Sequence, residues 1–465
     1  MPAIETIDPA TGKRLETFEY MSDGEVRSRL ERAMICQHEW RERSFADRAA
    51  LLKAAARTLR SRQDQLAQTV TREMGKPIVQ ALPEIEKCAW CCDFYAENSE
   101  RFLSDEPIRT NAAASFVAFR PLGVILAVMP WNFPFWQVFR AAAPALMAGN
   151  AIVLKHASNV TRCALQIEDV FEASGAPKGL FTTLVLPSDR VAALLADRRI
   201  AAATLTGSEA AGISVASAAA RQLKKTVLEL GGSDPFIVLA DADLEAAVNT
   251  AVKSRFQNAG QSCIAAKRFI VQSEVYDEFL ARFAHAAAAR KIGDPMDRAT
   301  QMGPLARSDL RDSLHRQVEE STKRGARIVT GGRPVSRPGF FYEATVLADV
   351  GADAPAFSEE TFGPAAAVTQ AEDAQTAVEL ANRSSFGLGA TIWSADVERA
   401  AALAARVESG SVFINGMMAS DPRLPFGGIK RSGYGRELSH YGIREFVNVQ
   451  TVWVGPAQES PPPVD

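Results

Sequence analysis

The chain has 465 residues, of which 47% are hydrophobic and 23% charged, and its formal net charge is −3 at pH 7. This length exceeds a typical single hydrophobic core, so we expect two or three domains. A small net charge without a long basic run excludes the usual signature of nucleic-acid-binding proteins. We therefore expect a globular protein that acts on a small molecule and has no nucleic-acid partner.

The N-terminal sequence MPAIETIDPATGKRLETF lacks the apolar segment of a secretory signal. Apolar stretches such as Val124–Met129 are far shorter than the roughly 20 residues of a membrane span. We expect a cytoplasmic protein with no membrane partner. The cysteines around Cys88–Cys92 have no second group of ligands nearby, and the five histidines are scattered, so neither a zinc site nor disulfides are expected.

The first 105 residues are mostly amphipathic, and we expect helices there. Ser44–Met74 places leucines and alanines at helical spacing, with arginine and glutamate between them. Ser115–Arg120 alternates as a strand does, and Pro121-Leu122-Gly123 then predicts a turn.

From residue 123 to 240 short apolar runs alternate with amphipathic segments. The runs predict buried strands at Gly123–Met129, Ala151–Leu154 and Ala202–Leu205. The segments between and after them predict helices at Phe139–Ala148, Arg162–Ala173 and Ser208–Arg221. Strands separated by helices indicate a parallel sheet.

A second alternation follows, so the second domain is also expected to be α/β. Its predicted strands are Pro235–Leu239, Lys267–Val271, Glu343–Leu347, Ala365–Val368, Ala390–Trp393 and Ser411–Ile414. Its predicted helices are Asp243–Ser254, capped by Asp241 or Asp243, then Glu274–Ala289, Ala374–Asn382 and Val397–Arg406.

Cys263 is the first candidate for chemistry. It follows the small and polar residues Asn258-Ala259-Gly260-Gln261-Ser262. A helix ending near Gln257 and a tight turn at Gly260 would leave the thiol at a loop tip, where nearby dipoles can ionise it and a substrate can reach it. The alternative is a small buried hydrophobic residue, which the segment favours when it is considered alone.

Two further segments offer complementary groups. Glu229 ends an apolar run and precedes Gly231 and Gly232, so its carboxylate could have a raised pKa and act as a general base. Asn132 lies between prolines and aromatic residues in Met129–Trp136 and offers a neutral N–H donor of the kind an oxyanion hole needs. The alternatives are a solvated carboxylate at a strand end and an aromatic turn in the core.

Three more segments are weak signals by themselves. Thr204–Gly212 enters a helix through Gly207-Ser208, and a helix N-terminus reached in this way can bind a phosphate. Glu360, in Glu359–Pro364, could accept hydrogen bonds from a ribose diol. Pro425–Gly433 is rich in glycine, and an ordinary loop is the alternative for both of the last two segments.

Taken together, the segments WNFP, TGS, ELGG, GQSC, EETFGP and PFGGIKRSG occur in an order and at spacings that resemble the aldehyde dehydrogenase superfamily. The resemblance extends over essentially the whole chain. It implies an α/β fold with a parallel-sheet dinucleotide-binding domain, an α/β catalytic domain and a small β oligomerisation element. The implied boundaries are residues 1–112 and 128–229 for the NAD(P)-binding domain, 230–440 for the catalytic domain, and 113–127 with 441–465 for the oligomerisation element.

The resemblance also implies roles for individual residues. Cys263 corresponds to the nucleophile, Glu229 to the general base and Asn132 to the oxyanion donor beside the backbone N–H of Cys263. The reaction would convert an aldehyde to an acid through a thiohemiacetal and a thioester. The expected cofactor-binding residues are Trp131, Asn132, Lys155, His156, Ala157, Ser158, Gly207, Ser208, Glu209, Leu230, Glu360 and Phe362.

The choice between NAD and NADP stays open. Members that prefer NAD often carry a glutamate where Ser158 stands, and that carboxylate would repel a 2′-phosphate. Serine removes the repulsion and leaves a donor. His156 replaces the usual proline and would add positive charge if it were protonated.

The C-terminal sequence most resembles the shorter bacterial succinate-semialdehyde dehydrogenases, whose substrate carries a distal carboxylate. Arg140 and Ser420 correspond to residues that bind this carboxylate, Gln257 stands where relatives often have a second arginine, and Arg423 is a candidate substitute. The alternative for Arg140 is a salt bridge on a helix surface. Another aliphatic or aromatic aldehyde, a CoA-acylating enzyme and a catalytically silent protein are the rival functions.

Two more expectations rest on the resemblance alone. Ala265 stands where some relatives have a second cysteine that forms a regulatory disulfide, so we expect no such switch. A strand pair like Ser115–Leu126 and a C-terminal strand like Phe446–Trp453 cross a subunit interface in related enzymes, which implies a homodimer or homotetramer.

Overall fold

The computed structural model describes residues 3–456. The chain begins with a hairpin of β1 (Ala3–Ile7) and β2 (Arg14–Glu19), which the expectation of helix over residues 1–105 missed. In β1 alternate side chains are buried, the period of a strand rather than of a helix. Four helices follow: α1 (Asp23–Trp40), α2 (Phe45–Ser61), α3 (Gln63–Met74) and α4 (Ile78–Phe102). The predicted helical segment Ser44–Met74 is therefore two helices, which meet at Arg62.

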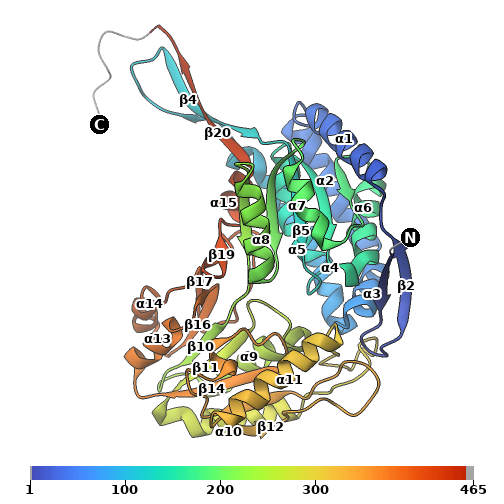
Figure 1. Cartoon of the computed structure of the whole chain (residues 1–465). Helices are drawn as coiled ribbons and strands as arrows, with labels where there is room; N and C mark the ends of the chain where they lie inside the picture. Colours follow the sequence, from blue (N-terminus) through green and yellow to red (C-terminus); the bar gives the residue numbers. More distant parts are fainter. Residues whose placement is uncertain (1–2, 457–465) are drawn as a thin grey trace.

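A six-stranded sheet forms the upper lobe in Figure 1. In spatial order its strands are β19 (Gly433–Tyr434), β9 (Lys225–Glu229), β8 (Ile200–Thr206), β5 (Val124–Met129), β6 (Ala151–His156) and β7 (Phe181–Thr183). The helices that connect them are α5 (Trp136–Met147), α6 (Thr161–Ala173), α7 (Val191–Ala196) and α8 (Glu209–Ala220). From β5 to β9 the strands run parallel, which confirms the prediction, whereas β19 is antiparallel to β9. The strand order reverses between β5 and β8, and such a switch point creates a crevice at the carboxyl ends of the strands.

A seven-stranded sheet forms the lower lobe in Figure 1. In spatial order its strands are β12 (Arg327–Thr330), β13 (Thr345–Ala348), β14 (Ala365–Ala371), β11 (Ala266–Gln272), β10 (Asp234–Val238), β16 (Gly389–Trp393) and β17 (Ser411–Ile414). Its helices are α9 (Leu244–Phe256), α10 (Tyr276–Ala288), α11 (Ser308–Lys323), α12 (Pro355–Ser358), α13 (Ala374–Asn382) and α14 (Val397–Ala404). Asp243 caps α9 by accepting the backbone N–H of Ala246, as one of the two sequence alternatives predicted. The second α/β alternation is thus confirmed.

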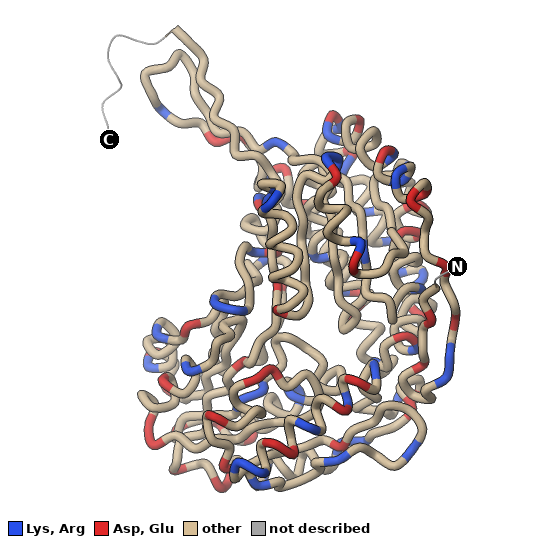
Figure 2. The backbone as a smooth tube through the Cα atoms, in the orientation of Figure 1, with Lys and Arg blue, Asp and Glu red and all other residues tan. Residues whose placement is uncertain are grey.

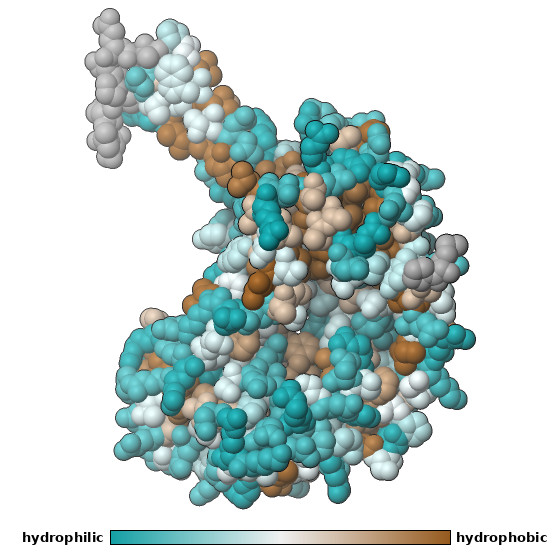
Figure 3. All heavy atoms as spheres, in the orientation of Figure 1, coloured by the Kyte–Doolittle hydropathy of each residue, from teal (hydrophilic) through white to brown (hydrophobic). Residues whose placement is uncertain are grey.

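A β arm projects from the upper lobe (Figure 1). It consists of β3 (Glu106–Pro107), β4 (Ala114–Pro121) and β20 (Val447–Val454), and β4 pairs with β20 along its whole length. Apolar side chains follow this arm in Figure 3, and Val449 and Trp453 are among its exposed residues. The remaining short elements are β15 (Phe386–Gly387), which pairs antiparallel with β18 (Ile429–Lys430), and α15 (Ser439–Arg444), which packs against α4 and α5.

The structure differs from the predicted strand pair Ser115–Leu126. Its second half, Val124–Leu126, belongs to β5 in the middle of the six-stranded sheet and not to the arm. The physical reason is Gly123, whose φ of 137° turns the chain, followed by a run of apolar residues that are almost all buried. Residues 124–127 therefore lie outside the arm, although the expected oligomerisation element included them. Its last nine residues, 457–465, lie outside the described part of the chain.

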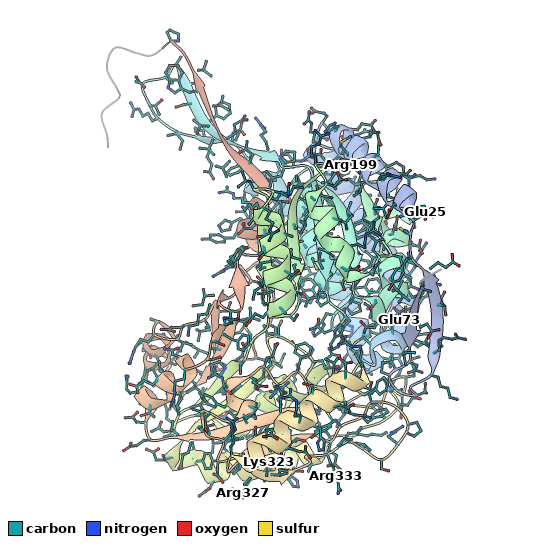
Figure 4. All side chains as sticks on the ribbon, viewed as in Figure 1. Glu25, Glu73, Arg199, Lys323, Arg327 and Arg333 are labelled. Atoms are coloured by element: carbon teal, nitrogen blue, oxygen red, sulfur yellow. The ribbon has the colours of Figure 1, made fainter. Side chains whose placement is uncertain are left out.

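Charged residues of both signs are spread over the two lobes. Figure 2 shows Lys and Arg interspersed with Asp and Glu in both lobes. Glu73, labelled in Figure 4, is a buried carboxylate at the end of α3. It accepts hydrogen bonds from the backbone N–H groups of Arg162 and Cys163 at the start of α6.

Among residues 3–456, no helix combines the length and the apolar character that a membrane span requires. The same residues contain no cluster of three or more His, Cys, Asp or Glu suited to a metal ion.

Candidate active site

A cavity of about 190 Å³ lies between α4, α5 and the loop that carries Cys263. Four of the residues predicted from the sequence line it together: Cys263, Arg140, Gln257 and Ser420. They come from positions as far apart as 140 and 420, so only the fold brings them together. A cavity of this size suits a short substrate.

The loop before Cys263 has an unusual backbone. Asn258 and Ala259 have φ angles of 54° and 51°, and Gly260 follows at 73°. Left-handed conformations are unfavourable for residues other than glycine and persist only where the surroundings impose them. Here Arg255, fully buried, donates to the carbonyl oxygens of Gly260 (2.6 Å) and Ala266 (3.1 Å). The helix ends at Phe256, close to the predicted position.

Cys263 is half-buried and faces the cavity, so it is not simply a filler of the core. Burial raises the pKa of its thiol to about 12, against the opposing effects of Arg140 and Lys267. This effect is opposite to the expected ionisation of the thiol by local dipoles. Attack on a substrate therefore calls for a base that accepts the thiol proton.

Glu229 ends β9 and is 2% exposed, so the alternative of a solvated carboxylate is wrong. Neither of its carboxyl oxygens has a hydrogen-bond partner among residues 3–456. Burial raises the pKa of Glu229 well above its usual value, and the nearby Glu437 raises it further. A β-carbon at Gly427 would lie 2.6 Å from a Glu229 oxygen, so glycine lets the Pro425–Gly433 loop close over this carboxyl group. A buried carboxyl without partners is suited to proton transfer.

Asn132 lies at the carboxyl end of β5 and links two parts of the site. Its side-chain amide donates to the carbonyl oxygen of Gln261 (3.2 Å), and its own carbonyl accepts from the side chain of Asn258 (2.9 Å). Both bonds tie the turn after β5 to the loop of the cysteine. One N–H of the Asn132 amide is still available for a further acceptor.

His156 supports the same turn. Its ring nitrogens face the carbonyl oxygens of Met129 (3.2 Å) and Pro134 (2.9 Å), and Ala157 donates its backbone N–H to Nδ1. The ring is buried, and burial lowers its pKa to about 4. The expectation that His156 adds a positive charge is therefore wrong. The neutral ring instead connects the end of β6 to both ends of the turn that carries Asn132.

The residues predicted to hold the cofactor gather at the carboxyl edge of the six-stranded sheet. Trp131 and Asn132 follow β5, Lys155 and His156 end β6 with Ala157 and Ser158 after it, Gly207 to Glu209 follow β8, and Leu230 follows β9. Parallel strands place all these ends at one edge, beside the switch point between β5 and β8. The sequence motifs, scattered over a hundred residues, are therefore brought together at one edge of the sheet.

The residues at this edge have the chemistry that a dinucleotide requires. Ser208 caps α8 by accepting the N–H of Ala211, and a helix N-terminus reached through Gly207-Ser208 favours a phosphate. Lys155 is buried, and the structure records no ion pair for it within residues 3–456. Unpaired cations are rarely buried, so an anionic ligand is its natural partner. Ser158 is exposed at the same strand end and carries no negative charge.

Glu360 and Phe362, two of the expected cofactor-binding residues, also lie near the cysteine loop. Glu360 accepts the backbone N–H of Gly232 (2.9 Å) and lies 3.7 Å from the buried ammonium of Lys267. The ring of Phe362 meets that of Trp131 edge to face, with 5.7 Å between centroids. Glu209, at the start of α8, is instead bound to Arg431 in an ion pair at the surface.

Arg140 is 1% exposed and forms an ion pair with Glu437, so the alternative of a helix-surface salt bridge is wrong. It also donates to the hydroxyl of Thr206 (3.3 Å) and lies over the ring of Phe426. Arg423 is not among the residues that line the cavity. Its guanidinium binds the carboxylate of Asp421 and is largely exposed, so the structure gives no support to its predicted role at the substrate.

Comparison with known proteins matches residues 2–452 to the aldehyde dehydrogenase family. The chain belongs to this family. It is 53% identical over 452 residues to a probable NADP⁺-dependent succinate-semialdehyde dehydrogenase of Synechocystis sp., covering 97% of this chain and 100% of that protein. It is 50% identical over 448 residues to a succinate semialdehyde dehydrogenase of Escherichia coli strain K12, described as NAD(P)⁺-dependent, covering 96% and 97%.

A solved structure of a related enzyme has the same fold as this chain. The succinic semialdehyde dehydrogenase of Streptococcus pyogenes, in complex with NADP⁺, is 40% identical, and the two structures superpose with a TM-score of 0.95. The match covers 98% of this chain and 100% of that one. The mixed α/β architecture is therefore that of the aldehyde dehydrogenase family.

Sequence reasoning missed several residues of this aldehyde dehydrogenase site. Lys87 and Glu84 line the cavity from α4, and Glu437 holds Arg140. A signal existed for the first two: Glu84, Lys87 and Cys91 follow each other at intervals of three and four, on a face of α4 that is otherwise apolar. Charged residues on such a face call for partners elsewhere in the fold. No pattern in the sequence pairs Glu437 with Arg140.

Proposed function

We propose that this aldehyde dehydrogenase oxidises succinate semialdehyde to succinate with NAD⁺ or NADP⁺. The observation that carries the proposal is the cavity that Cys263 shares with the buried Arg140 and with Ser420. A thiol beside a guanidinium suits a short substrate that has an aldehyde at one end and a carboxylate at the other. The relatives named above, at 50% and 53% identity over nearly the whole chain, support the same substrate.

The proposed chemistry begins with Cys263. A base removes the thiol proton, and the thiolate attacks the aldehyde carbon to give a thiohemiacetal. The side-chain N–H of Asn132 and the backbone N–H of Cys263 stabilise the negative oxygen. A bound nicotinamide would supply the hydride acceptor, and loss of a hydride from the thiohemiacetal carbon leaves a thioester on Cys263.

Glu229 has its role in the second half of the reaction. Its carboxylate takes a proton from a water molecule, whose oxygen attacks the thioester carbon. The carbon–sulfur bond breaks, the acid leaves, and the Cys263 sulfur regains its proton. The burial that raises the pKa of Glu229 also makes its ionised form a stronger base than an exposed carboxylate. Because Glu229 can activate water, free acid is the expected product, and CoA is not needed as an acceptor.

For the cofactor, we propose that both nucleotides bind. Lys155 and Ser158, at the end of β6, would face the adenine ribose, and neither opposes a 2′-phosphate. Two relatives described as NADP⁺- or NAD(P)⁺-dependent support this assignment. The start of α8 would hold the pyrophosphate, and Glu360 and Phe362 would contact the nicotinamide ribose.

We also propose that the enzyme is a homodimer or homotetramer. The arm of β4 and β20 projects from the body and carries the exposed apolar residues Val449, Trp453 and Val454. An exposed apolar strand pair is an aggregation risk unless another chain covers it. Sedimentation velocity would distinguish the two assemblies, and a monomer would contradict both. A cytoplasmic location stays a prediction from the sequence.

A matrix of initial rates tests the function. Succinate semialdehyde, glutarate semialdehyde, butanal and benzaldehyde are each measured with NAD⁺ and with NADP⁺. We expect kcat/KM for succinate semialdehyde to exceed that for butanal by at least about tenfold, the usual effect of one hydrogen bond to a charged group. Equal values for the two aldehydes would contradict the proposed substrate and favour a general aliphatic aldehyde dehydrogenase.

A further inference from the structure

The charged residues that line the cavity are not balanced. They are Glu84, Lys87 and Arg140. Glu84 is paired with Lys76, and Arg140 with Glu437, and both pairs are buried. The structure records no ion pair for Lys87 within residues 3–456. The cavity wall therefore carries one positive charge that forms no ion pair with a carboxylate within residues 3–456.

Lys87 has only neutral partners. Its ammonium donates to the hydroxyl of Ser420 (2.9 Å) and lies 4.3 Å from the centre of the Trp136 ring. An ammonium has three N–H donors, so donors remain for a ligand. Gln257, which also lines the cavity, brings no charge.

The hydroxyl of Ser420 is oriented by the same contacts. It accepts hydrogen bonds from both Lys87 and the indole N–H of Trp136 (3.0 Å). A hydroxyl oxygen has two lone pairs and one hydrogen. Because both lone pairs are used, the hydrogen of Ser420 is left to donate to another acceptor. Lys87 and Ser420 thus offer adjacent donors, which is the arrangement that a carboxylate requires.

The surroundings of Lys87 disfavour its charged form unless an anion is close to it. Burial, and then the nearby positive charge of Arg140, lower the pKa of Lys87 to about 8. The nearby carboxylate that opposes this effect is that of Asp421. Asp421, however, is already bound to Arg423. A desolvated cation with no paired carboxylate is stabilised when an anion enters the cavity.

We propose that Lys87 binds the distal carboxylate of the substrate together with Ser420, and that Arg140 adds to the positive potential of this site from its pair with Glu437. The proposal rests on the proposed function, since it names the residue that selects a carboxylated aldehyde. Because Arg140 is already paired with Glu437, its charge attracts a carboxylate less strongly than that of an unpaired cation does. Lys87 supplies a positive charge that has no ion-pair partner within residues 3–456.

The test compares Lys87→Met, Lys87→Arg and a control, Lys53→Met, which changes an exposed lysine of α2. The measured quantity is kcat/KM for succinate semialdehyde divided by kcat/KM for butanal. We expect Lys87→Met to lower this ratio by about 10- to 100-fold, mainly through KM, as the loss of a hydrogen bond to a charged group does. Lys87→Arg should restore part of the ratio, and Lys53→Met should leave it at the wild-type value.

The outcomes separate the two levels of the proposal. If the wild-type enzyme does not prefer succinate semialdehyde to butanal, the proposed function fails. If the wild-type preference holds and Lys87→Met keeps it, the assignment of Lys87 alone is overturned. If Lys87→Met lowers kcat/KM for succinate semialdehyde and for butanal by the same factor, the assignment of Lys87 is also overturned. Lys87 would then only hold Trp136 and Ser420 in place.

A second measurement does not depend on turnover of the carboxylated aldehyde. Succinate is added as an inhibitor of butanal oxidation, and its inhibition constant is determined for the same variants. We expect this constant to rise about 10-fold or more in Lys87→Met and to stay unchanged in Lys53→Met. Equal inhibition constants in the wild type and Lys87→Met would contradict the site. Melting curves of each variant verify that it folds.

Discussion

The buried ammonium of Lys267 donates a hydrogen bond of 2.8 Å to the backbone carbonyl oxygen of Cys263. The same nitrogen donates to the carbonyl of Ser262 (3.0 Å) and lies 3.7 Å from the carboxylate of Glu360. One side chain of β11 thus holds the carbonyl groups of the two peptide bonds that flank the nucleophile, the one before it and the one after it. It also connects this backbone to a carboxylate expected at the nicotinamide ribose.

Lys267→Met tests this connection. The change leaves buried carbonyl oxygens without a donor, each at a cost of about 1–3 kcal/mol, and removes the cation near Glu360. We expect a lower melting temperature and a fall in kcat of about tenfold or more, because the loop no longer holds the thiol in one position. Wild-type kcat in a variant that melts at the wild-type temperature would show that Lys267 does not position Cys263.

The ion pair of Arg140 and Glu437 leads to a separate prediction about the free energy of unfolding. In Arg140→Met, Glu437 is left buried without its partner, which typically costs about 3–5 kcal/mol. In Arg140→Met with Glu437→Leu, both charges are gone, and we expect most of the stability to return. Chemical denaturation measures both effects. No recovery in the double variant would indicate that Arg140 stabilises the fold through Thr206 and Phe426 rather than through the pair.

His156 predicts a pH dependence of stability. Its pKa is about 4 in the folded protein, against a usual value of 6.5, because the buried ring stays neutral. Between these two values the unfolded chain binds a proton that the folded protein does not. Stability should therefore fall as the pH decreases from about 6.5 to about 4, by up to about 1.4 kcal/mol per pH unit from this group.

The control for this effect is His156→Asn, which cannot gain a proton. The free energy of unfolding is measured for both proteins at several pH values, and the difference between them is compared. We expect the difference to change below pH 6.5 and to be constant above it. A difference that does not vary with pH would show that the ring of His156 is also protonated in the folded protein.

The sequence predicts the regular elements well where burial alone decides them. The helix Ala374–Asn382 and the strand Ser411–Ile414 have the predicted bounds, since each is an apolar pattern between clear turn signals. The gathering of the cofactor motifs at one edge was also predictable, because several of them follow strands of one parallel sheet. Elements that depend on distant partners could not be predicted. For example, the two residues of β19 form a strand only because they pair with the edge strand β9.

The chemistry of the site depends still more on tertiary contacts. The sequence gives no indication that Glu437 would hold Arg140, or that His156 would be buried between two carbonyl oxygens. It also suggests an ionised thiol at Cys263, whereas burial in the fold raises the pKa of that thiol. In each case the local pattern names the residue, and the surrounding fold determines its charge and its partner.

The central claim is that the aldehyde becomes a thioester on Cys263 which Glu229 then helps to hydrolyse. Glu229→Gln should slow only the second half, so the thioester accumulates when the variant receives succinate semialdehyde and NADP⁺. Mass spectrometry of its peptides measures this directly. We predict a succinyl group on the peptide that contains Cys263, and none when Cys263→Ala is added. A succinyl group on another cysteine, or rapid formation of succinate without any group on Cys263, would contradict the account.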